Sequence, residues 1–99
     1  GTGSSAISVR GTSQTAIRVD DWAAAVTSIE NAYIIQLQNY SNTTTYKTVL
    51  TRTNTAANGV DATGGLWRNT AAITSILYYP GVGSWITGST FTLYGIKAE

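Results

Sequence analysis

The sequence predicts an all-β fold, and two observations carry that prediction. Thr is the most frequent residue, and its branched Cβ favours the pleated surface of a strand. Short runs of alternating apolar and polar residues also recur along the chain, separated by Gly, Pro, Asn and Ser turn signals. About seven such runs in a chain of this length are typical of an antiparallel β-sandwich, so we expect residues 1–99 to form a single domain.

The first third of the chain predicts a lead-in, a hairpin and one helical turn. Residues 1–5 are small and polar, as expected of a flexible lead-in. Residues 6–10 and 14–19 alternate on either side of a Gly-containing turn, which predicts a β-hairpin. Residues 20–26 are the only helix-like stretch, and they are too short for an independent helix. We therefore expect a short helical turn there, with Trp22 closing one end of the core.

Two strands are predicted in the middle of the chain. Residues 33–38 form the most apolar run and are expected at the centre of a sheet. Residues 45–53 alternate, which places Lys47, Val49 and Thr51 on the same face.

The remaining chain predicts a long loop followed by three strands. Residues 54–64 are mostly small and are expected to form a loop, in which Asn58 and Gly59 signal a tight turn. The predicted strands that follow are residues 65–68, 73–79 and 90–97.

The last two predicted strands are apolar on both faces. A two-layer sandwich normally buries one face of each sheet, so apolar residues on the second face indicate that something covers it. The alternative is ordinary exposed apolar surface, which every protein has. The candidate interface residues on these strands are Ile76, Tyr78, Tyr94 and Ile96.

The composition argues against an enzyme and for assembly. The chain has no Cys and no His, so disulfides, thiolate metal sites and the most common general base are excluded. Charged residues make up 11% of the chain and the net charge is +1, so little repulsion would keep copies apart. A small domain without disulfides often gains stability from neighbouring subunits.

No catalytic residue, cofactor or metal ion is predicted. Glu30 and Asp61 could form a carboxylate pair for sugar hydrolysis, but their spacing gives no support for it. Asp20, Asp21 and Asp61 lack the alternating ligand pattern of a calcium loop, and capping or turn roles are favoured for them.

Nucleic acid and membranes are also not expected as partners. The six basic residues are scattered and form no run, which argues against nucleic-acid binding. No apolar stretch is long enough to span a membrane.

Carbohydrate binding is the alternative function that the residues leave open. Sugars stack on exposed aromatic rings beside hydroxyl and amide groups. Trp85 lies in a Gly-rich predicted loop, and Tyr40 and Asn42 lie in another. The competing interpretation is that Trp85 belongs to the core or to a subunit interface, as large aromatic residues usually do.

Three segments carry a family resemblance. The stretches NYSNTTTYKTVLTR (residues 39–52), GGLWRNTAAITSI (64–76) and GSTFTLYGIKA (88–98) resemble a domain of tailed-bacteriophage structural proteins. The resemblance covers residues 7 to 99 and marks a fold, with no catalytic residues attached to it. It implies a jelly-roll-like sandwich on a virion surface, in a tail fibre or in a capsid decoration (cement) protein, and commonly a homotrimer.

The resulting prediction is a non-enzymatic bacteriophage structural protein on the surface of the virion, assembled in the host cytoplasm. Its expected partners are further copies of itself, a trimer being favoured, and other virion proteins. The alternative is a receptor-binding or carbohydrate-binding head for host attachment, which would add a host surface glycan as a partner.

Overall fold

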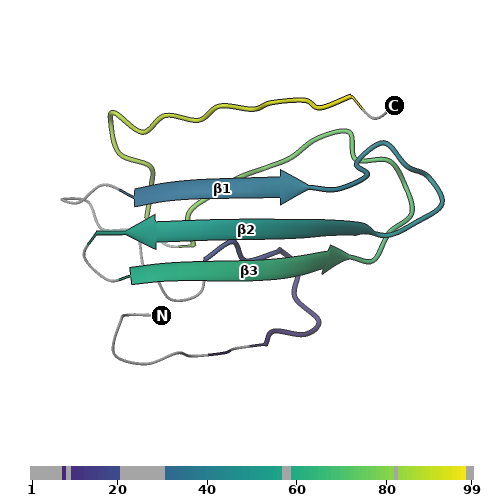
Figure 1. The fold of residues 1–99 in the computed structure, drawn as a ribbon, viewed down its shortest axis with the longest axis horizontal. Helices are drawn as coiled ribbons and strands as arrows, with labels where there is room; N and C mark the ends of the chain where they lie inside the picture. The colour runs from purple at the N-terminus through teal and green to yellow at the C-terminus, as the bar shows by residue number, and fades with distance from the viewer. Residues whose placement is uncertain (1–7, 9, 21–30, 57–58, 82, 98–99) are drawn as a thin grey trace.

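The described chain is all-β and is organised around one antiparallel sheet. A computed structural model describes residues 8, 10–20, 31–56, 59–81 and 83–97. Its strands are β1 (Asn31–Leu37), β2 (Lys47–Thr55) and β3 (Gly59–Trp67), in the order β1-β2-β3 (Figure 1). Within these residues, no helix is long and apolar enough to cross a membrane.

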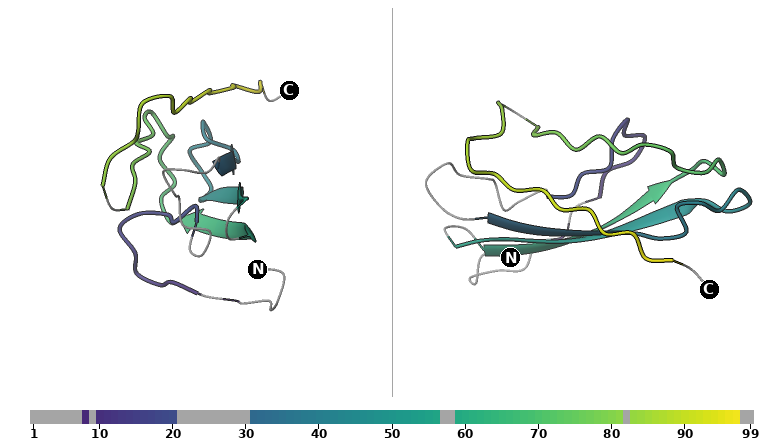
Figure 2. Two further views of the ribbon diagram at one scale, coloured as in Figure 1. Left: turned by 90° about the vertical axis from the view of Figure 1, so that its left-hand side faces the viewer. Right: turned by 90° about the horizontal axis from the view of Figure 1, so that it is seen from above.

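The two faces of the sheet differ in what covers them. Along β2 every second residue is buried, because alternate side chains point to opposite faces. The pairing is continuous, so Thr53 lies between Tyr33 and Asp61 on the buried, inner face. Residues 10–20 and 68–80 cross this face as irregular chain, whereas the described residues leave most of the other face open (Figure 2).

The buried centre of the sheet is small and mostly polar. Val49 is the only buried apolar residue among the described residues. Its buried neighbours along β2 are Lys47, Thr51, Thr53 and Thr55. A core of this kind gains little from the hydrophobic effect and depends on satisfied hydrogen bonds.

Lys47 joins the sheet to the chain that follows β3. Its side chain is completely buried, and its Nζ donates hydrogen bonds to the carbonyl oxygens of Thr45 at 2.9 Å and Thr70 at 2.6 Å. The Nζ also lies 5.9 Å from the centre of the Trp67 ring, within range of a cation–π contact. Lys47 therefore holds Thr70 beside the first residue of β2.

The threonines of β2 allow a paired test of this polar core. Thr51 Oγ1 donates to the Val19 carbonyl oxygen at 2.9 Å, which attaches residues 10–20 to the sheet. Thr53 Oγ1 is buried and has no hydrogen-bond partner among the described residues. We expect Thr51→Val to lower the free energy of unfolding by about 1 kcal/mol, and Thr53→Val to leave it unchanged or raise it by up to about 1 kcal/mol.

Urea unfolding of the two variants at one protein concentration checks this expectation. The substitutions are matched, since both replace a buried threonine on the same strand with a residue of the same shape. Equal losses of stability would contradict the assignment, because Thr53 would then also make a stabilising hydrogen bond.

The all-β class, the antiparallel pairing and two of the predicted strands are confirmed. The run at 33–38 forms β1, and the run at 45–53 forms β2. Lys47, Val49 and Thr51 share a face as predicted, and that face is the buried one. The chain also reverses at the predicted turn, where Gly59 begins β3 with a φ of 138° that favours glycine.

Other parts of the prediction are wrong. The strand at 33–38 is an edge strand of the described sheet, not a central one, because β1 pairs only with β2 among the residues that the structure describes. The predicted loop at 54–64 lies mostly within β2 and β3, where Thr and Val favour extended structure despite the glycines. Residues 14–19, 73–79 and 90–97 are not paired as strands in the described chain.

Two further predictions fall outside the described residues. Most of the helical turn expected at 20–26 lies there, together with Trp22. So does most of the strand expected at 6–10.

Candidate functional site

A cluster of four aromatic rings joins β1 to the C-terminal part of the chain. Tyr78 lies at its centre, with ring centroids 6.3 Å from Tyr33, 5.0 Å from Trp85 and 5.8 Å from Phe91. Trp85 and Phe91 meet edge to face at 5.0 Å. The segments that carry Tyr78, Trp85 and Phe91 share no strand pairing with one another, and ring contacts hold them on β1. Each ring contact contributes about 0.5–1.5 kcal/mol beyond the area that it buries.

The two tyrosines of this cluster are held in the neutral form. Burial is the main cause that raises the pKa of Tyr33, and the charge and the hydrogen bond of Asp20 raise it further. Burial likewise raises the pKa of Tyr78 to about 12, with smaller contributions from Tyr33 and Asp20. Tyrosines are ordinarily neutral at neutral pH, and the raised pKa values extend the pH range over which the two rings of this cluster stay uncharged.

A groove lies beside the cluster, along the open edge of β1. It has a volume of about 370 Å³. Ile34 points to the outer face of the sheet, whereas Tyr33 and Ile35 point to the inner face, so the groove runs along the edge of the strand. Its walls are Tyr33, Ile34 and Ile35 on one side and Thr90, Thr92 and Tyr94 on the other.

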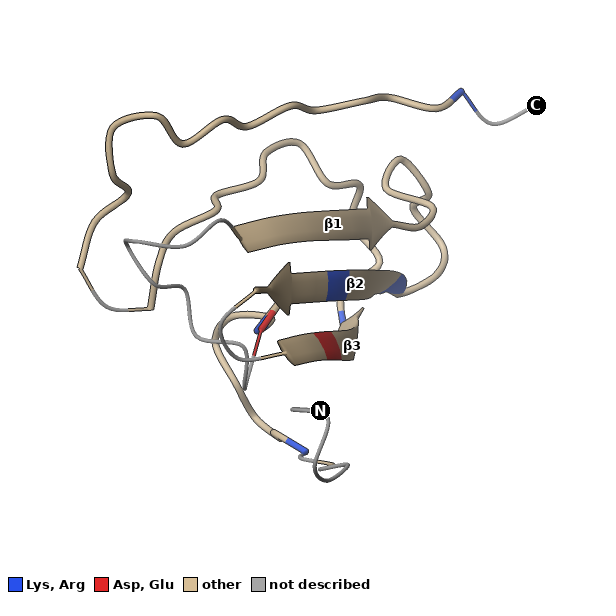
Figure 3. Cartoon of the chain, turned by 60° about the vertical axis from the view of Figure 1, so that its left-hand side comes forward, with Lys and Arg blue, Asp and Glu red and all other residues tan. Residues whose placement is uncertain are grey.

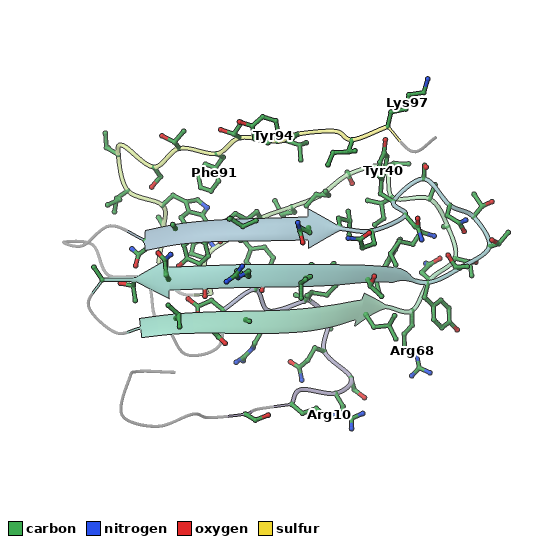
Figure 4. All side chains as sticks on the ribbon, in the orientation of Figure 1. Arg10, Tyr40, Arg68, Phe91, Tyr94 and Lys97 are labelled. Carbon is green, nitrogen blue, oxygen red and sulfur yellow. The ribbon has the colours of Figure 1, made fainter. Side chains whose placement is uncertain are left out.

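The segment that forms the outer wall of the groove contacts little of its own chain. We call residues 90–97 the C-terminal arm. Phe91 points from the arm toward the sheet (Figure 4), where it joins the aromatic cluster. Beyond it, Leu93 is 85% exposed, Tyr94 83% and Ile96 86%. Apolar residues exposed together to this extent mark a surface for interaction.

The four predicted interface residues are divided between two environments. Ile76, Tyr94 and Ile96 are exposed and available to a neighbour. Tyr78 is half-buried and already packs against three rings of its own chain. Tyr94 and Ile96 therefore lie together on the arm, whereas Ile76 lies in a different segment. Tyr78 packs against rings of its own chain.

The three predicted ligand-binding residues do not converge on one site. Trp85 is 38% exposed and stacks within the aromatic cluster. Tyr40 is exposed in the β1–β2 connection, where its carbonyl oxygen accepts a hydrogen bond from the Ile73 amide at 2.8 Å. Asn42 Oδ1 accepts hydrogen bonds from the amides of Thr44 and Thr45 at 2.7 and 2.8 Å. The side-chain carbonyl oxygen of Asn42 is thus used to hold its own loop, and this is the group with which Asn42 would accept a hydrogen bond from a ligand.

Charges are few and dispersed over the described chain. No group of three or more acidic, His or Cys side chains that could hold a metal ion is present among the residues that the structure describes. β1 carries no charged residue, and the C-terminal arm carries only Lys97 at its end (Figure 3). Glu30, which was considered as a partner of Asp61, lies outside the described residues.

Sequence reasoning missed the part that β1 plays in this site. Tyr33, Ile34 and Ile35 were expected inside a central strand, because their run is the most apolar in the chain. An apolar run is equally compatible with an edge strand that is covered by a neighbour. Periodicity alone does not distinguish such an edge strand from a central strand.

Comparison with known proteins gives no further assignment. No protein-family model matches the chain, and no match is found among curated proteins or solved structures.

Proposed function

We propose that this chain is a non-enzymatic structural protein of a bacteriophage virion, located on the particle surface, and that it acts by assembly between copies. The phage setting rests on the resemblance of residues 39–52, 64–76 and 88–98 to phage structural domains. Assembly rests on the amount of surface that one copy leaves exposed.

That exposed surface is the observation that carries the proposal. The accessible surface of the chain is 8244 Å². A compact monomer of its mass, 10.5 kDa, would expose about 5,400 Å². The difference of about 2,800 Å² per chain would amount to about 5,600 Å² for a pair of chains, at the upper end of the totals of about 2,000–5,000 Å² or more that obligate subunit interfaces bury. The radius of gyration, 14.8 Å, also exceeds the roughly 13 Å of a compact domain of this length.

The proposed assembly also accounts for the strands that are missing from a complete sandwich. Residues 73–79 and 90–97 have the alternating pattern of strands but form no strand pairing within the described part of one copy. We propose that neighbouring copies or other virion proteins complete the jelly-roll-like sandwich by pairing with these segments.

Host glycan recognition is the alternative, and the geometry supports it less. A sugar platform needs an open aromatic face with free hydrogen-bonding groups beside it. Trp85 uses its faces and edge on Tyr78 and Phe91, and Asn42 uses its carbonyl oxygen within its own loop.

Mass spectrometry of purified particles tests the location. Particles of the phage whose genome encodes this chain should contain it in many copies after density-gradient purification. Recovery of the chain only from the unassembled fraction of the lysate would overturn the virion assignment.

The variant Trp85→Ala separates assembly from recognition. If assembly is the function, the variant weakens the oligomer, because Trp85 supports the base of the C-terminal arm. An unchanged oligomer that has lost its binding to host cells would favour glycan recognition instead.

A further inference from the structure

β1 is a sheet edge without the protection that natural edges have. Edge strands are usually protected by charges, by proline or by a bulge, because their free backbone groups would otherwise pair with another chain. The sequence of Asn31–Leu37 contains no charged residue and no proline, and its register with β2 is uninterrupted from Asn31 to Leu37. This edge is therefore ready to accept a strand.

The opposite edge, β3, is different. Its inner face carries the charged residue Asp61, and three of its nine residues are glycines. Gly65 lies opposite Val49 on the inner face, and a Cβ atom there would lie 2.5 Å from Cγ2 of Ile17, so residues 10–20 pack closely against the inner face of β3. Of the two edge strands in the described chain, β1 is the one that carries no charged residue.

The C-terminal arm has the complementary property. It runs alongside β1 in the same direction but stands clear of it (Figures 1 and 2). No backbone hydrogen bond joins residues 90–97 to β1, and the groove of about 370 Å³ lies between them. Since the arm and β1 run in the same direction, one strand between them can be antiparallel to both at once.

We infer that the strand in this groove is the C-terminal arm of a second copy of the chain. The exchange is reciprocal about a two-fold axis, so each copy inserts its arm into the groove of the other. The resulting order across the interface is β1, partner's arm, own arm, partner's β1. Each neighbouring pair in this order is antiparallel, and the two sheets become one continuous sheet.

The exchange provides partners for both elements at once. The backbone edge of β1 gains hydrogen bonds along residues 32–37, and the arm gains them on both sides. The exposed side chains of Leu93, Tyr94 and Ile96 gain cross-strand neighbours from the partner, with Leu93 on the face opposite Tyr94 and Ile96. A cyclic trimer does not place two arms antiparallel about a two-fold axis, so this inference predicts a pair with a mass of about 21 kDa from two chains of 10.5 kDa.

Disulfide trapping tests the exchange, and the absence of native Cys makes the readout clean. One tagged chain carries Ile34→Cys, and an untagged chain carries a single Cys at position 92, 93 or 94. After co-assembly and mild oxidation, we expect a disulfide between the tagged and untagged chains for at least one arm position. Val60→Cys on β3 is the matched control, because Val60 is 61% exposed and Ile34 62%, and it should give no cross-link to the arm.

A proline in the arm gives a second, independent test. Thr92→Pro removes one backbone N–H and should weaken the pair at least about tenfold, whereas Thr92→Ala keeps the N–H and should have a small effect. The isolated chain should still fold, because residue 92 makes no backbone hydrogen bond to β1 in its own chain.

The inference rests on the proposed function, and the two fail in different ways. An oligomer that forms no cross-link between position 34 and the arm, or that survives Thr92→Pro unchanged, would overturn arm exchange and leave assembly standing. A stable monomer at all concentrations would overturn both. In a chain that carries Ile34→Cys and the arm Cys together, a disulfide within one chain would show that the arm pairs with its own β1, and it would also overturn the exchange.

Discussion

Replacing Tyr78 by alanine is expected to lower the free energy of unfolding by about 2 kcal/mol and to release the C-terminal arm. A fully buried ring costs about 3–5 kcal/mol when it is truncated, and Tyr78 is half-buried, so its cost falls below that range. The loss is still large because Tyr78 contacts three other rings, and these contacts hold segments that share no strand pairing. Urea unfolding at one protein concentration measures the effect.

Two control variants identify the cause. Tyr78→Phe keeps the ring and should retain most of the stability. Leu77→Ala changes the preceding residue, which is largely exposed, and should cost no more than about 0.5 kcal/mol. If Tyr78→Ala costs no more than Leu77→Ala, the aromatic cluster does not organise the C-terminal part of the chain.

The second large effect is expected at Lys47. Lys47→Ala should lower the free energy of unfolding by about 3 kcal/mol, because it removes a completely buried stem and two hydrogen bonds from a charged donor. Lys47→Met keeps most of the stem and should recover part of that loss. The same urea titrations measure both variants.

The comparison of these two variants separates packing from hydrogen bonding. Stability equal to the unsubstituted chain in Lys47→Met would mean that the hydrogen bonds to Thr45 and Thr70 contribute nothing. A Lys47→Met variant as unstable as Lys47→Ala would mean that the buried stem contributes nothing. We expect an intermediate value.

The fold could be predicted from the sequence where the local pattern was strict. The alternation around Lys47, Val49 and Thr51 identified β2 and its shared face, because strand geometry places every second side chain on one side. Residues 54–64 were misread because small residues and glycines are common in loops. In this chain, pairing with β2 outweighs that preference.

The position of a strand within its sheet could not be predicted from composition. β1 is apolar although strands do not flank it on both sides in the described chain, and the groove lies between it and the C-terminal arm. Residues 90–97 have the pattern of a strand but form no strand pairing in the described chain. The two errors have one physical origin, which is that an apolar or alternating run fits an edge strand or an unpaired segment as well as an interior strand.

The candidate site shows the same limit. Tyr94 and Ile96 were selected because the arm is apolar on both faces, and both are exposed on it. Trp85 was selected as a residue of a Gly-rich loop, and its contacts with Tyr78 and Phe91 depend on a long-range fold that loop composition does not describe.

The most direct test of the central claim is the mass of the chain in solution. Sedimentation velocity over a roughly hundredfold range of concentration should give a multiple of 10.5 kDa that dissociates on dilution, with a melting temperature that rises with concentration. A species of 10.5 kDa throughout, with a melting temperature independent of concentration, would contradict assembly as the function.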